Sequence, residues 1–237
     1  MHNRRDLEIY DRIPLPKSLA IPQRSRLYSV EPIGIGTPDT ESISSYLTRL
    51  AQEHSLPLKK LVMGEIAPGI LGDQYQPEML SKNVGCIFGH SDAKPAINGM
   101  IDMTRSLVNV LEQLTLRQDL RYLSCLTYQG VIKDRSLFRQ HKAWCPHCFQ
   151  QQKQENRAVY ESLLWSFKDV NYCLKHNCQL SDRCPHCDSL QKAITNNSCL
   201  GYCDKCKQWL GNNLNNVVEI TDKEHQIIIG IGDLIAT

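Results

Sequence analysis

Apolar residues recur with the spacing of an amphipathic helix from Ser42 onward. Positions i, i+3, i+4, i+7 and i+8 form one helical face, and they are occupied by Ile43, Tyr46, Leu47, Leu50 and Ala51. Thr40 or Ser42 can cap this helix.

A second short helix is predicted after a break at His54 and Ser55, because Pro57 is acceptable in a first helical turn. The same spacing then resumes at Leu58, Leu61 and Val62. Two short helices joined by a tight turn are predicted, which makes a helix-turn-helix candidate.

A second helical pair is predicted between Met100 and Leu123. The first helix of this pair is marked by Met100, Met103, Leu107, Leu111 and Leu114. Thr115 then stands three residues before Gln118, the spacing of a capping box, and the apolar residues that follow are Leu116, Leu120 and Leu123. Either pair could read nucleic acid, but helical hairpins are more often plain packing units. Residues 64–99 are rich in Gly, Pro and Asn, and we expect them to lack regular structure.

Four pairs of metal-ligating residue types follow, each with two residues between its members. They are Cys145/Cys148, Cys173/His176, Cys184/Cys187 and Cys203/Cys206. A two-residue gap lets the backbone NH groups of a tight turn face both sulfurs while the side chains converge on one ion. The pairs predict two zinc ions, one held by three cysteines and a histidine and one by four cysteines. Sequential pairing gives two compact modules, and a cross-braced pairing stays open.

Both zinc ions are predicted to be structural, and the chain is predicted not to be an enzyme. A catalytic zinc keeps one position open for water, whereas each expected site has four protein ligands, and the HxE motif is missing. The tetrad CPHC occurs twice and resembles thiol oxidoreductase active sites. Each tetrad is followed by another ligand pair, however, which favours metal binding. No residues form a convincing nucleophile and base.

The other cysteines have plainer interpretations. Cys178 is an alternative to His176, but only His176 keeps the two-residue gap from Cys173. Cys199 is also close enough in sequence to the Cys203/Cys206 pair to replace one of its ligands. Cys86 and Cys125 are interpreted as small buried apolar residues, which leaves eight predicted ligands.

The pattern as a whole predicts a mainly α fold with small zinc-ribbon β elements. An N-terminal helix-turn-helix-type domain is followed by two tandem zinc-binding modules. In the second half, helical spacing predicts a helix through Tyr160, Leu163, Leu164 and Phe167. A short strand is predicted at residues 170–172. The expected segments are a proline-rich arm at 1–36, a helical domain at 37–142, zinc modules at 143–180 and 181–213, and a C-terminal segment at 214–237.

Two terminal features complete this organisation. Within the arm, EPIGIGTPD lacks both the GxGxxG spacing and the GK[ST] ending of phosphate loops, and so a turn before the first helix is predicted. The chain ends in DLIAT, which looks cut rather than capped. This ending leaves open that the chain is one portion of a longer protein.

Charge changes the picture only locally. The formal net charge is +2. Seven thiolates and two zinc ions would bring the net charge to about −1 (2 − 7 + 4), so bulk charge favours no partner. Between residues 117 and 142, six basic residues outnumber two acidic ones, and such a stripe could contact nucleic-acid phosphates. The basic residues are Arg117, Arg121, Lys133, Arg135, Arg139 and Lys142.

The N-terminus predicts the compartment. MHNRRDLEIYDRIPLP carries charges where a secretory signal needs an apolar stretch, and no run approaches the ~18 apolar residues of a membrane span. We expect a soluble protein of the bacterial cytoplasm, associated with the nucleoid when it is bound to DNA. In that reducing compartment metal binding explains most of the cysteines better than disulfides do.

Three stretches together resemble the TniQ family of transposition proteins. They are PIGIGTPDTESISSYLTRLAQEHSL, LTLRQDLRYL, and WCPHC followed by YESLLWSFKDVNYCLKHNCQLSDRCPHC. The resemblance covers roughly residues 30–210, and its motifs stand in the family's order. It implies a targeting adaptor without a catalytic site, similar to TnsD-type selectors and to the TniQ subunits of CRISPR-associated transposons.

The resemblance also implies partners. Such adaptors couple a chosen DNA site to a AAA+ ATPase, TnsC, which recruits the transposase, so contact with the transposase is indirect. The site is either an attachment sequence or the target of a CRISPR effector complex and its RNA. A DNA-binding regulator unrelated to transposition is the alternative, because helix-turn-helix and zinc modules would suffice for it.

Overall fold

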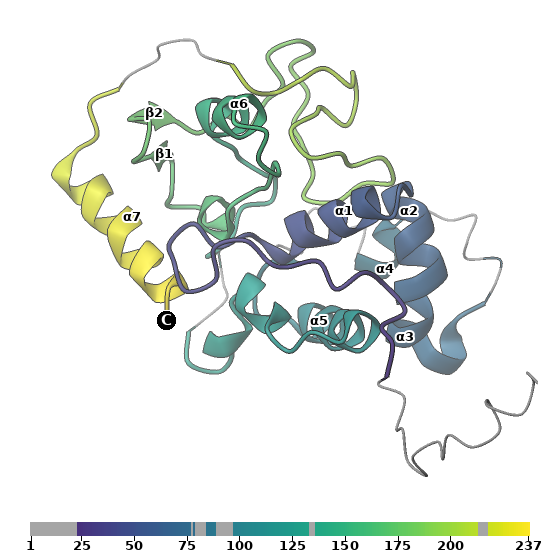
Figure 1. The fold of residues 1–237 in the computed structure, drawn as a ribbon. Coiled ribbons are helices and arrows are strands. Elements are labelled where there is room, and N and C mark those ends of the chain that lie inside the picture. The colour runs from purple at the N-terminus through teal and green to yellow at the C-terminus, as the bar shows by residue number, and fades with distance from the viewer. Residues whose placement is uncertain (1–22, 77, 79–83, 89–96, 133–135, 213–217) are drawn as a thin grey trace, which may run out of the picture.

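Helices dominate the fold, and the strands are short. The computed structural model describes residues 23–237 except 77, 79–83, 89–96, 133–135 and 213–217 (Figure 1). The α-helices are α1 Ile43–Glu53, α2 Leu58–Leu61, α3 Ala67–Leu71, α4 Gly85–Phe88, α5 Asp102–Thr115, α6 Pro146–Gln154 and α7 Asp222–Ile235. Strands β1 Tyr172–Cys173 and β2 Cys178–Gln179 pair antiparallel. The predicted mainly helical fold with small β elements is thereby confirmed.

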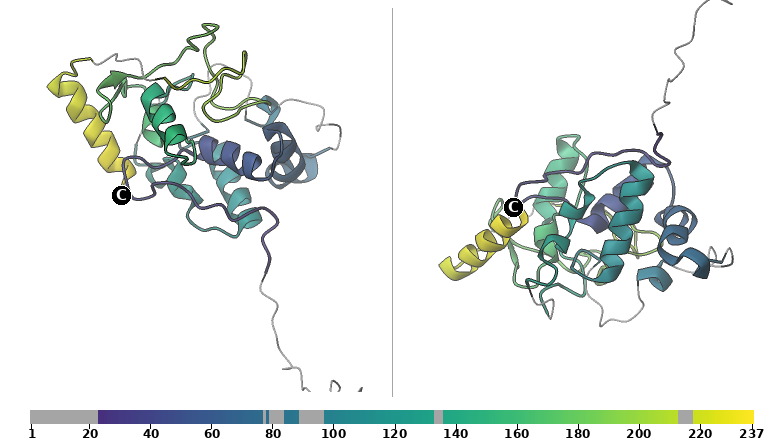
Figure 2. Two further views of the ribbon diagram at one scale, coloured as in Figure 1. Left: turned by 45° about the horizontal axis from the view of Figure 1, so that its top comes forward. Right: turned by 90° about the horizontal axis from the view of Figure 1, so that it is seen from below.

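Two hydrophobic cores organise these elements. The first lies among α1 to α5, and its buried residues include Tyr46, Leu50, Met63 and Leu107. The second surrounds the cysteines, with Trp144 and Phe149 among its fully buried side chains. In Figure 1, α1 to α5 form one half of the molecule, while α6, β1 and β2 lie in the other half. Helix α7 runs along the outer edge of the cysteine-rich half, as the views in Figure 2 also show.

Helix α1 is the most deeply buried element of the first core. All five apolar positions of the predicted face are at most 1% exposed. The Ser42 side chain accepts a hydrogen bond from the Ser45 backbone NH at 3.2 Å, so Ser42 is the N-cap residue. The Thr40 hydroxyl instead donates to the backbone oxygens of Gly34 and Thr37. Burial on all sides leaves α1 little surface for a partner.

The turn after α1 occurs where the sequence predicts it, but the second helix is longer than expected. Ser55 has a positive φ of 54°, which stops α1, and α2 then begins at Leu58. A π-helical turn at Val62–Ile66 joins α2 directly to α3. The prediction that residues 64–99 lack regular structure is therefore wrong for α3, a 3-10 turn at Gly72–Gln74, and α4. Buried residues such as Ile66 and Ala67 hold this stretch against the first core.

The predicted capping box at Thr115 is wrong. Thr115 is the last residue of α5, and its hydroxyl donates to the Leu111 backbone oxygen at 2.7 Å. Leu116 then adopts the left-handed conformation with φ 57°. The chain continues as two 3-10 turns, at Leu120–Leu123 and Leu126–Tyr128. Buried Leu120 and Leu123 pack on the first core, so the apolar spacing there marks burial in short turns and not a second α-helix.

The predicted helix through Tyr160 and Phe167 is also wrong. Only a 3-10 turn forms, at Leu163–Ser166, and the Ser162 side chain caps it. The backbone here pairs with the chain before α1: the Ser42 NH donates to the Glu161 oxygen, and the Leu163 NH donates to the Thr40 oxygen at 2.7 Å. These long-range bonds hold the segment extended and join the two halves of the molecule.

The described end of the predicted arm is part of the folded body. The backbone NH groups of Arg26 and Leu27 both donate to the Leu114 oxygen, and Leu27 is 5% exposed. The Tyr46 hydroxyl donates to the Val30 oxygen at 3.0 Å. Residues 23–36 therefore lie across α1 and α5, while residues 1–22 are outside the described part of the chain. The predicted turn in EPIGIGTPD is present, with Gly34 and Gly36 at positive φ.

Helix α7 closes the second core. Thr221 and Glu224 form a capping box at its start, Ile228 is 2% exposed, and Gly232 packs against Pro38. The Tyr128 hydroxyl donates to the Leu234 oxygen near its end. Across the described residues, every helix is too short or too polar to span a bilayer.

Candidate metal centres

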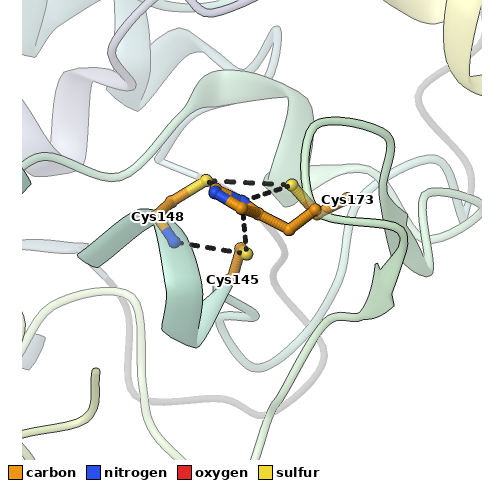
Figure 3. Close-up of side chains that lie close together, drawn as sticks. Cys145, Cys148 and Cys173 are labelled. Carbon is orange, nitrogen blue, oxygen red and sulfur yellow. Dashed lines mark hydrogen bonds between the residues drawn. The ribbon is translucent and has the colours of Figure 1, made fainter. Parts of the chain in front are cut away.

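The first candidate centre gathers Cys145, Cys148, Cys173 and His176. Their ligand atoms all lie within 4.8 Å of one another. Figure 3 shows the sulfurs of Cys145, Cys148 and Cys173 turned toward a common point, two of them from the start of α6 and one from β1. The imidazole Nδ1 of His176 is 3.5 Å from the Cys145 sulfur, 3.4 Å from the Cys148 sulfur and 3.6 Å from the Cys173 sulfur.

The second candidate centre gathers Cys184, Cys187, Cys203 and Cys206, again within 4.8 Å of one another. The Cys184 and Cys206 sulfurs are 3.6 Å apart, and the Cys187 and Cys203 sulfurs are 3.7 Å apart. The structure thus groups the pairs sequentially, 145/148 with 173/176 and 184/187 with 203/206, and not in a cross-braced order.

These distances suit tetrahedral zinc. With Zn–S bonds of about 2.3 Å and Zn–N bonds of about 2.0–2.1 Å, tetrahedral angles put two sulfurs about 3.8 Å apart and a sulfur and a nitrogen about 3.6 Å apart. The observed separations lie close to both values, and they exceed the ~2.05 Å of a disulfide by far. Two clusters of soft thiolates with one imidazole could therefore hold metal ions, and zinc is compatible with both.

The local chain supports the charge that a thiolate would carry. Cys145 is the N-cap residue of α6, and its sulfur accepts a hydrogen bond from the Cys148 backbone NH. In the second cluster the Cys203 sulfur accepts from the backbone NH groups of Lys205 and Cys206, both at 3.4 Å. Such donors favour the thiolate form. Helix α6 was not predicted, although Pro146 directly after a capping residue is a signal for a helix start.

The two clusters share one core. The Trp144 and Ser181 backbones exchange both NH groups and oxygens, at 2.9 and 2.8 Å, and the Trp144 indole NH donates to the Leu210 oxygen. Trp209 packs over Gly201, where an added Cβ would come within 2.2 Å of its ring. The Trp209 indole NH donates to the Gln150 side chain of α6 at 2.9 Å. Segments 143–180 and 181–213 are therefore in extensive contact.

The remaining cysteines differ in their surroundings. Cys178 is 2% exposed, and its sulfur lies 3.5 Å from the Cys145 sulfur. Cys199 is half-buried, and its sulfur accepts a hydrogen bond from the Gln52 amide. Cys125 is buried, as expected for a small apolar residue. Cys86 is in α4, but its side chain is outside the described part of the structure.

Most of the described residues of the basic stripe form ion pairs or hydrogen bonds with other groups of the protein. Lys133 and Arg135 lie outside the described residues. The Lys142 ammonium is 2.8 Å from Glu161, and both side chains are under 10% exposed. Arg139 donates to the Val170 backbone oxygen and to the Asn171 side chain, and Arg117 is paired with Asp119 at 2.5 Å. Arg121 is exposed, with its guanidinium 5.0 Å from the centre of the Tyr122 ring.

The pKa shifts of the buried cations agree with a division of the stripe into cations compensated inside the protein and cations exposed to solvent. Burial alone would lower the pKa of Lys142, but the nearby carboxylates of Glu161 and Asp204 outweigh it and raise the pKa. Burial lowers the pKa of Arg139. Lys142 therefore carries a charge that is compensated inside the protein, whereas Arg121 presents its charge to solvent.

The fold and the clusters together define the class of the protein: it is mainly helical and has two four-donor sites that could bind zinc. The model of the TniQ family matches residues 32–180, well over half of the chain. The protein belongs to the TniQ family. No curated protein matches the chain. Family membership agrees with the resemblance in the sequence, and it indicates a non-catalytic adaptor role associated with transposition.

Proposed function

We propose that the protein is a target-site selection adaptor in DNA transposition. It would link target DNA to an AAA+ ATPase of the TnsC type, which recruits the transposase. The family match over residues 32–180 carries this proposal. The clusters support it: when four protein ligands saturate a zinc ion, no position remains for a reacting water. Cys145, Cys148, Cys173 and His176 would hold one ion, and Cys184, Cys187, Cys203 and Cys206 the other.

The ATPase would contact residues 23–31 and the turn between α1 and α2. Helix α1 itself is buried almost throughout, so its surroundings must supply the surface. Tyr28 is 59% exposed and Leu56 40% exposed, and Tyr28 stacks on His54 with ring centroids 4.0 Å apart. The Tyr28 backbone NH also donates to the His54 ring nitrogen at 2.9 Å. The two segments thus present a joint surface with exposed apolar groups, which suits a protein partner.

Reconstitution with an AAA+ ATPase of the TnsC type tests the proposal. We expect the protein to be retained with the ATPase on DNA, because an adaptor must bind both. Changing both Tyr28 and Leu56 to Asp should reduce that retention at least about tenfold, since charges would replace apolar contact. Co-sedimentation on DNA measures retention, and sequencing of insertion sites in a transposition assay measures targeting.

Two outcomes would contradict the adaptor proposal. A protein that neither joins the ATPase on DNA nor alters the distribution of insertions is no adaptor. Tight, sequence-selective binding to DNA alone, with a steep salt dependence and no effect of the ATPase, would instead support the autonomous regulator. Sensitivity of targeting to a CRISPR effector complex and its RNA would distinguish the guided pathway from attachment-site selection.

The exposed Arg121 is our candidate for contact with DNA. We expect Arg121→Ala to weaken DNA binding of the adaptor–ATPase complex by about tenfold or less at moderate salt. One lost phosphate contact should also reduce the slope of log K against log salt by about 1. Fluorescence anisotropy with labelled duplex DNA over a salt series measures both quantities.

Arg157→Ala is the matched control, because it removes the same charge from a similarly exposed arginine, whose partner is Glu155. It should leave the slope unchanged. Equal weakening by both variants would show that only net charge matters, and an unchanged Arg121→Ala variant would remove Arg121 from the interface.

A further inference from the structure

A fifth donor sits against the first metal centre. The strand register pairs Cys173 of β1 directly with Cys178 of β2, so both side chains project from the same face of this two-stranded ladder. The Cys178 sulfur is 3.5 Å from the Cys145 sulfur, a separation close to the edge of a zinc–sulfur tetrahedron. The Cys178 sulfur therefore lies beside the cluster, next to Cys145, but outside the set of four donor atoms that all lie within 4.8 Å of one another.

The two competing donors are held differently. His176 belongs to the turn between β1 and β2, next to Asn177 at a positive φ of 46°, and it is half-buried. Cys178 belongs to the strand, is 2% exposed, and has its position fixed by the ladder. The donor on the turn can leave the ion by a local change in the turn, while the donor on the strand stays beside Cys145.

We propose that Cys178 is a reserve ligand, which takes the place of His176 at the first metal centre when the imidazole is withdrawn. In the exchange, the bond from the metal to the His176 nitrogen breaks and a bond from the metal to the Cys178 sulfur forms. The thiol proton of Cys178 passes to solvent, and no electrons are transferred. The charge of the site changes from −1 (three thiolates and a divalent ion) to −2 (four thiolates). The inference goes beyond the adaptor role and requires only that the first centre binds metal.

Metal content and cobalt spectra of four full-length proteins test this inference. We expect His176→Ala to keep as many ions per chain as the unaltered protein, with metal affinity reduced by no more than about 10- to 100-fold, the range typical of losing a supporting group. Its cobalt(II) form should gain sulfur-to-metal charge-transfer absorption, because a thiolate replaces the imidazole. Cys178→Ser should also keep all its ions, with the cobalt spectrum unchanged. His176→Ala combined with Cys178→Ser should lose one ion per chain.

Each of the following results would contradict the proposal that Cys178 is a reserve ligand. Loss of an ion, or failure to fold, in His176→Ala alone would show that Cys178 cannot complete the site. Loss of an ion in Cys178→Ser alone would make Cys178 a resident ligand. Retention of all ions by the double variant would show that neither donor is needed. An unaltered protein without metal would instead refute the metal centres themselves, and the adaptor proposal would still be tested separately by ATPase binding.

Discussion

Replacing Cys148 by Ser is expected to unfold the cysteine-rich half of the protein. Cys148 lies in the first turn of α6 and is 8% exposed, within the second hydrophobic core. A structural zinc contributes on the order of 10 kcal/mol of apparent folding free energy, whereas a whole domain is stable by about 5–15 kcal/mol. Loss of Cys148 therefore removes a free energy comparable to the whole stability of this half. We expect one ion fewer per chain and a lost cooperative melting transition, measured by elemental analysis and circular dichroism.

Cys199→Ser is the control for this experiment. Cys199 is a half-buried thiol outside both clusters, and a serine oxygen can still accept the hydrogen bond from Gln52. This variant should keep every ion and melt like the unaltered protein. A Cys148→Ser protein that melted cooperatively at an unchanged temperature would contradict a structural role for the first centre.

Replacing Arg49 by Ala is expected to destabilise the protein by about 3–5 kcal/mol, the cost of leaving a buried charge uncompensated. The Glu41 side chain is fully buried, and Arg49 is its cationic partner, at 2.6 Å. Arg49 also donates to the Glu31 backbone oxygen at 2.8 Å, which holds the segment before α1 in place. Urea unfolding followed by tryptophan fluorescence measures the free energy of unfolding.

Two further variants isolate this effect. Arg157→Ala breaks an exposed ion pair and should cost no more than about 1 kcal/mol. Combining Arg49→Met with Glu41→Gln removes both charges and should recover much of the stability lost in Arg49→Ala. If Arg49→Ala cost as little as Arg157→Ala, the buried pair would not stabilise the fold.

Features encoded by local spacing could be predicted from the sequence. The buried face of α1 follows from positions three and four residues apart, and Ser42 caps it from just before its first turn. The two-residue gaps likewise brought each pair of candidate ligands together. In these cases the residues that interact are neighbours along the chain, so the sequence pattern already contains the geometry.

Features that depend on distant segments could not be predicted in this way. Helical spacing between Tyr160 and Phe167 is overridden by hydrogen bonds to residues before α1. The basic stripe looked continuous in sequence, but Lys142 meets Glu161 and Arg139 meets the Val170 backbone. Which cations face solvent is decided by these partners, and no spacing rule reveals them.

The segment between Cys187 and Cys203 of the second cluster contacts the first core, and this contact limits where the chain can be truncated. Ala193 and Ile194 pack on the core formed by α1 to α5. Asn196 accepts hydrogen bonds there from the backbone NH groups of Lys59 and Val84. A fragment that ends at residue 180, where the family match ends, would lack Ala193 and Ile194 and so expose the apolar surface that they cover. It would also lack Leu210, whose backbone oxygen accepts the hydrogen bond from the Trp144 indole NH. The smallest fragment expected to fold is therefore longer than the region that the family model matches. Transfer of the second cluster to another family member would also require the α2 surface that Asn196 contacts.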